Sequence, residues 1–163
     1  MALKMEFRRS ATLATALALL SAISLTALGT SPARADRCDD IATQLKGQID
    51  GLKVGIAAAN VIYLSHPAAK ELSLGCRGRN YSNELYAKTD RKPKPEFFDL
   101  VGKATAIVFT LPKDDALTGT TRCITRMGLL RGDNIKMRYR RLDFECSRTR
   151  TEASIAITRG TNE

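Results

Sequence analysis

The amino-acid sequence predicts an α+β fold in two layers, with an antiparallel sheet of about four strands and helices on one face. Apolar residues recur at steps of three and four in segments 41–63 and 97–108, a pattern typical of amphipathic helices. Apolar and polar residues alternate in segments 72–76 and 135–146, which indicates strands that bury one side. Similarity between distant segments further predicts two helix-strand-strand halves.

The first predicted helix extends to Tyr63 and carries one apolar stripe. Two aspartates precede the helix and favour its N-terminus, and Ser65-His66-Pro67 ends it. Because glycine is a poor helix former, we expect the helix to use its glycines for close packing or to break near Gly51 or Gly55. The stripe consists of Ile41, Leu45, Ile49, Leu52, Ile56, Ala59 and Tyr63.

Two strands and a linker complete the first half. Residues 72–76 predict a strand, residues 77–80 a turn, and residues 83–88 the returning strand. The basic, proline-spaced run 91–95 is typical of a linker. It separates the two halves, which cover about residues 36–90 and 95–160.

The second half begins with two predicted helices. Glu96 starts the first helix, and Pro112 with two following aspartates starts the second. Residues 135–139 and 142–146 then alternate with opposite parity, so we expect a β-bulge at the two arginines between them. Residues 153–157 predict the last strand.

Two pairs of similar segments support the duplication. Val54–Leu64 (VGIAAANVIYL) resembles Val101–Leu111 (VGKATAIVFTL), and Leu72–Cys76 resembles Leu142–Cys146. The economical interpretation is a duplicated helix-strand-strand unit. The alternative is chance similarity between two alanine-rich helices.

The N-terminal 35 residues predict an export signal. A positive n-region precedes an uncharged stretch over 11–29 and a small-x-small cleavage site at Ala33-Arg34-Ala35. We expect cleavage to leave one disulfide-stabilised domain over 36–163, periplasmic or secreted from a bacterium, with no transmembrane segment. The alternative is a retained anchor, for which such a stretch is just long enough.

Four cysteines in the mature part predict two disulfides, as is usual for an exported domain. The gaps of 38, 47 and 23 residues lack the close cysteine pairs of zinc sites. Three connectivities are open from sequence alone. Equivalent positions of Cys76 and Cys146 in the two halves favour one bridge per half, Cys38 with Cys76 and Cys123 with Cys146.

The residues expected for catalysis are scarce, so we expect no catalytic site, cofactor or metal. His66 is the single histidine, and its place at a predicted helix end favours a backbone hydrogen bond over catalysis. The chain has no Gly-x-Ser-x-Gly elbow, P-loop or GxGxxG motif. The mature part, about 128 residues long, is also too short for a multidomain enzyme or a membrane transporter.

Positive charge is concentrated in the second half. The mature part carries 22 Lys and Arg against 16 Asp and Glu, and residues 122–150 alone carry nine against three. The candidate anion-binding residues are Lys136, Arg138 and Arg140, which alternate on the outward side of a predicted strand, and Arg141 across the bulge. A solvated sheet face that prevents aggregation is the structural alternative.

These features favour a non-catalytic binding or envelope-associated protein. Its expected partner is an anionic envelope component or an acidic protein. Nucleic acid is not expected, because the basic strand offers no stacking platform. The alternatives are an accessory interaction module with an apolar groove and, with less support, a small hydrolase using a serine and His66. The oligomeric state is open.

Overall fold

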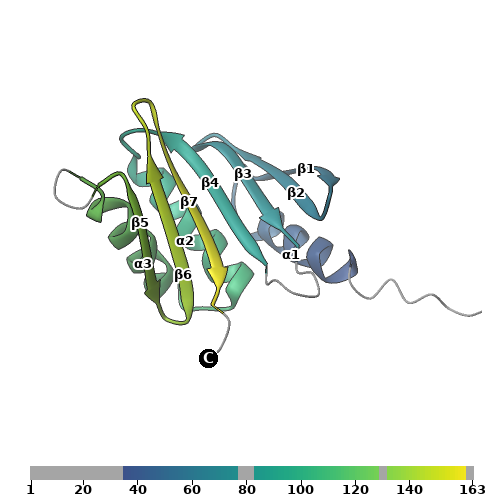
Figure 1. The fold of residues 1–163 in the computed structure, drawn as a ribbon. Helices are drawn as coiled ribbons and strands as arrows, with labels where there is room; N and C mark the ends of the chain where they lie inside the picture. Colours follow the sequence, from purple (N-terminus) through teal and green to yellow (C-terminus); the bar gives the residue numbers. More distant parts are fainter. Residues whose placement is uncertain (1–34, 77–82, 129–131, 161–163) are drawn as a thin grey trace, which may run out of the picture. The chain divides into compact units, whose positions relative to one another are not determined.

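Seven strands form one antiparallel sheet in the order β1-β2-β3-β4-β7-β6-β5 (Figure 1). The computed structural model describes residues 35–76, 83–128 and 132–160, so the expected export segment up to residue 34 and the expected turn at 77–80 lie outside the described residues. The strands are β1 Lys53–Ala58, β2 Val61–His66, β3 Ala69–Gly75, β4 Glu84–Asp90, β5 Asn134–Tyr139, β6 Leu142–Arg148 and β7 Glu152–Arg159. The helices are α1 Ala35–Gln48, α2 Pro95–Phe109 and α3 Lys113–Arg126.

The helices lie on one side of the sheet (Figure 1). Buried apolar side chains from the helices and the strands form one core cluster. Helix α3 packs on β5, β6 and β7, α2 packs on α3 and β4, and α1 contacts α2 and β1. The α+β class is therefore confirmed, whereas the expected number of about four strands is wrong. Strands β2, β3, β4, β6 and β7 bury alternate side chains, among them Ile62, Leu64, Leu72, Leu74, Leu85, Ala87, Leu142, Phe144, Ile155 and Ile157.

The predicted helix over residues 41–63 is correct only for its first part. Helix α1 ends at Gln48, residues 49–52 form a turn, and the chain continues from Lys53 into the hairpin β1–β2. Gly51 has a φ of 78°, a left-handed conformation that glycine adopts without strain. Ala59 and Asn60, with φ of 50° and 64°, form the two-residue turn between the strands. Two positive φ angles are the mark of the turn type that matches the twist of a hairpin.

A second tight turn replaces the β-bulge expected near Arg140-Arg141. Tyr139 pairs directly with Leu142, and the two arginines between them have φ of 51° and 64°. The parity of the apolar residues shifts because the chain reverses direction there. Only Lys136 and Arg138 of the four candidate cations therefore lie within a strand, and the other two form the turn.

The two halves meet at the central pair β4–β7. The first half is α1 with β1–β4 and the second is α2 and α3 with β5–β7, so neither is the expected helix-strand-strand unit. Val54–Leu64 forms a hairpin whereas Val101–Leu111 lies largely in α2, which overturns this part of the repeat. The other similar pair lies in β3 and β6, which flank the central pair symmetrically.

Disulfides attach a helix to the sheet in each half. Cys38 of α1 bonds Cys76, the residue directly after β3, and Cys123 of α3 bonds Cys146 of β6, the pairing that the sequence favours. Close to the second bridge, α3 lies tightly against the sheet: a Cβ atom added to Gly119 would lie 2.6 Å from Cζ of Phe144.

Candidate functional site

The four cations predicted from sequence lie together at one edge of the sheet. Lys136 and Arg138 are exposed on β5, while their strand neighbours Ile135 and Met137 are half-buried. The exposed residues Arg140 and Arg141 continue the row in the β5–β6 turn. Because β5 is an edge strand of the sheet that the described residues form, these exposed side chains lie at that edge.

Acidic side chains contact three of the four cations. Lys136 Nζ lies 2.5 Å from Glu145 Oε1, and Arg138 Nε lies 3.9 Å from Asp143 Oδ1. These are cross-strand pairs, because each acid stands directly opposite its cation on β6. The pairs hold the β5 side chains in place and neutralise part of the charge that the sequence concentrates there.

An arginine–tyrosine cluster joins α3 to this edge. The guanidinium carbons of Arg122 and Arg140 lie 5.2 and 5.8 Å from the ring centroid of Tyr139, within cation–π range. The Tyr139 hydroxyl donates to Asp115 of α3 at 3.2 Å, and Arg140 Nε lies 3.3 Å from the same carboxylate. The hydrogen bond with Tyr139 and the charge of Asp115 raise the pKa of Arg140.

We call the five exposed cations of this region the basic edge; they are Arg122, Lys136, Arg138, Arg140 and Arg141. Three acids contact members of the basic edge, so the cluster keeps a net charge of +2. Sequence reasoning missed Arg122, which α3 contributes from a distant part of the chain. No local pattern signals it, because its position depends on the packing of α3 against β5.

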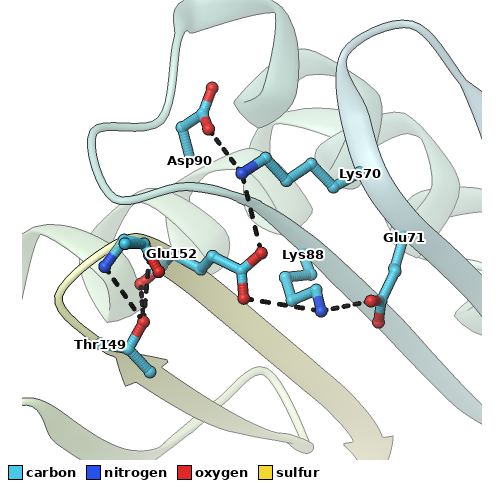
Figure 2. A network of polar contacts seen from close by, with 7 residues as sticks. Lys70, Glu71, Lys88, Asp90, Thr149 and Glu152 are labelled. Atoms are coloured by element: carbon cyan, nitrogen blue, oxygen red, sulfur yellow. Dashed lines mark hydrogen bonds and ion pairs between the residues drawn. The ribbon is translucent and has the colours of Figure 1, made fainter.

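A second charged cluster occupies the ends of β3, β4 and β7 (Figure 2). Lys70 Nζ lies 2.8 Å from Asp90 and 3.7 Å from Glu152, while Lys88 pairs with Glu71 and, at 3.6 Å, with Glu152. The hydrogen bond from Lys70 lowers the pKa of Asp90, and the bond to Glu71 raises the pKa of Lys88. Because this cluster contains both positive and negative side chains, it stabilises the pairing of the strands rather than forming a binding site for a charged ligand.

Two adjoining pockets of about 400 and 420 Å³ lie beside the start of α2, and His66 lines both. The backbone N–H of Ala68 donates to His66 Nδ1 at 3.1 Å. Nε2 therefore carries the proton and donates to the carbonyl of Asp50 at 3.0 Å. Both ring nitrogens form hydrogen bonds with backbone groups, so His66 links the β2–β3 turn to the loop after α1. The charged residues that line the two pockets are Asp50, Lys70, Asp90, Lys92, Lys94, Glu96, Asp99 and Lys103.

The opposite edge of the sheet differs in chemistry. All six residues of β1 are exposed, with Ile56 at 74% and Val54 at 39%, and neighbouring Tyr63 is 51% exposed. We call β1 the apolar edge, because Lys53 at its first position is its single charged residue. The run without charged residues from Val54 to Asn60 is the sequence signal for the apolar edge. The prediction of a helix over residues 41–63 prevented its recognition.

No family model matches the chain, and no curated protein or solved structure is significantly similar to it. Within the described ranges, no group of three or more His, Cys, Asp or Glu side chains is arranged to hold a metal ion. Among the same residues, no helix is long and apolar enough to cross a membrane. The two disulfides are typical of a protein from an oxidising compartment.

Proposed function

We propose that the protein is an exported, non-catalytic binding protein that docks through its basic edge on an anionic, phosphate-bearing component of the cell envelope. The cluster around Tyr139 carries the proposal: Arg122 and Arg140 both lie within cation–π range of its ring at an edge of the sheet. Four of the five cations are arginines, whose planar fork matches phosphate oxygens in bidentate hydrogen bonds.

The binding energies expected for this region indicate that arginines without an acidic partner contribute most to anion binding. A cation near an anionic surface contributes about 1 kcal/mol, so the net charge of +2 gives about 2 kcal/mol, which is weak binding. Within the described residues, neither Arg122 nor Arg141 has an ion pair within 4.0 Å. Direct hydrogen bonds from charged donors contribute about 1.5–3 kcal/mol each. These two side chains therefore supply the specific part of the binding.

Two observations bear on the alternative functions. His66 has both ring nitrogens in backbone hydrogen bonds, which leaves a hydrolase that uses it with the least support. The apolar edge favours the interaction module, since an uncovered strand can pair with another strand. This second candidate function concerns the other end of the sheet and is compatible with anion binding at the basic edge.

Vesicle binding tests the proposal. The oxidised protein should bind vesicles of an anionic phospholipid but not of a zwitterionic one, and binding should fall at least tenfold between about 0.05 and 0.5 M salt. The variant Arg122→Gln/Arg141→Gln should lose most of this binding. The control Lys46→Gln/Lys92→Gln removes the same charge from exposed sites outside the basic edge and should retain it.

Equal loss in both double variants would show that net charge, and not the basic edge, determines binding. Equal binding to zwitterionic vesicles would exclude phosphate recognition altogether. A partner retained from envelope extract in high salt, with no vesicle binding, would favour the accessory interaction module instead.

A further inference from the structure

Strand β1 is an edge strand whose six residues are all exposed and whose single charge is Lys53 at its first position. No side chain of β1 is buried on either face, and its second to sixth residues are Val-Gly-Ile-Ala-Ala. Edge strands in natural proteins are usually short, charged or covered, because their unpaired backbone groups can bind another strand. The β5 edge follows this rule with Lys136 and Arg138, whereas β1 does not.

We propose that β1 pairs with β1 of a second copy, so that two sheets join into one across a two-fold axis. The face pattern of β1 fits this symmetry. Val54 and Ala57 stand opposite the buried residues Leu64 and Ile62, whereas Lys53 and Ala58 stand opposite residues of the other face. The pattern is therefore the same from either end of the strand.

The irregular register in the middle of β1 produces this pattern. Between Val54 and Ala57 the chain has one residue more than β2 has between Leu64 and Ile62, so Gly55 and Ile56 together face Tyr63. A two-fold axis between Gly55 and Ile56 places Val54 opposite Ala57 of the partner and keeps both helical layers on one side of the joined sheet. The apolar side chains at the centre, led by Ile56 at 74% exposure, are then covered.

Charge favours a second copy of this edge over a contact with the basic edge. In the antiparallel pair, Lys53 of each copy lies opposite Ala58 of the other, and the two lysines are about 17 Å apart, farther than the screening length of about 8 Å. Pairing of β5 with itself brings Lys136 and Arg138 close to their own copies, which repels. Because β1 pairs with a second copy whereas β5 does not, assembly ends at a dimer and does not continue into a filament.

The size of the contact sets the expected affinity. A stable protein interface buries roughly 1,200–2,000 Å², and a strand of six residues is too small to reach that range. We therefore expect a reversible dimer with a dissociation constant between about 1 µM and 1 mM. The contact is independent of anion binding, because it lies at the opposite edge of the sheet.

Sedimentation of the oxidised protein from about 1 µM to 1 mM tests the proposal. The wild type should shift from monomer to dimer in this range, and hydrogen exchange of the β1 amides should slow as concentration rises. Ile56→Lys and Ile56→Glu should each weaken dimerisation at least tenfold, because residue 56 of both copies lies beside the axis. An equimolar mixture of the two variants should restore it, since opposite charges then meet.

Controls separate a lost contact from a damaged fold. Ile56 is exposed, so both variants should keep the wild-type circular dichroism spectrum and urea midpoint. Gln44→Lys adds the same charge to the exposed side of α1 and should dimerise like the wild type. A wild type that is monomeric throughout overturns the proposal, as does a dimer whose variants associate unchanged or fail to recover on mixing.

Discussion

Substitution of Gly119 by alanine probes the closest contact between the helical layer and the sheet. The new Cβ atom would lie 2.6 Å from Cζ of Phe144 and 3.1 Å from both neighbouring ring carbons. Carbon atoms in protein interiors are about 3.5–4.0 Å apart at their optimum, so the overlap is about 0.9 Å or more. Phe144 is only 1% exposed and has core neighbours on its other sides, which prevents a simple retreat of the ring.

The disulfide beside this contact increases the expected cost. Cys123 lies one helical turn after Gly119, and Cys146 lies two residues after Phe144 on the same side of β6, so their bond prevents α3 from moving away. Overpacking a core usually costs about 1–3 kcal/mol, and an approach as close as 2.6 Å places this substitution in the upper part of that range, at about 2–3 kcal/mol. Alanine recovers up to about 1 kcal/mol through its higher helix propensity. We therefore expect a net destabilisation of about 1–2 kcal/mol.

Urea unfolding of the oxidised protein measures this effect. With a denaturant dependence of about 1–3 kcal/mol/M, the midpoint should fall by roughly 0.3–2 M. The matched control is Gly47→Ala in α1, where an added Cβ has no atom within 4 Å and should leave stability unchanged or raise it. If Gly119→Ala is as stable as the wild type, the tight fit between α3 and β6 is wrong.

Two further substitutions test the ion pairs and the end of α3. Lys103 and then Lys113 lower the pKa of Asp99, so its contribution to stability is complete above about pH 4 and disappears as pH falls through the folded-state value. Asp99→Asn should therefore lower the free energy of unfolding in urea slightly at about pH 7, by less than about 1 kcal/mol, and this effect should shrink as the pH falls below about 4; an effect that does not change with pH would contradict this. Arg148 donates to two carbonyls in and after the last turn of α3. Arg148→Met should cost about 1–3 kcal/mol by the same assay, and an unchanged midpoint would show that these bonds are not needed.

Local patterns predicted much of the secondary structure but failed at two tight turns. The turns Ala59-Asn60 and Arg140-Arg141 have positive φ angles without a glycine, so the usual sequence signal of such hairpins is missing. At the first turn, an apolar spacing of three and four residues continues across Gly51 and imitates a longer helix. At the second, the change in parity could be explained by a bulge as well as by a turn.

In the candidate site, features that depend on neighbouring residues could be predicted, whereas contacts between distant residues could not. Alternation along one strand is a local property, so the outward position of Lys136 and Arg138 could be predicted. Their acidic partners on β6 could be found only with the hairpin register, which the expected bulge obscured. Arg122 and Asp115 reach Tyr139 from α3, and nothing in the spacing of these residues predicts that contact.

The central pair β4–β7 has a consequence for the order of folding. Every other ladder in the sheet joins strands that follow each other along the chain, whereas β4 must wait for β7. Contacts between distant residues form slowly, because a long loop must close before any of them is made. When the chain appears with its N-terminus first, β1 to β4 can assemble early. The edge of β4 stays unpaired until residues 152–159, which form β7, are also available. This interval is the period in which the folding chain is most exposed to wrong strand pairing.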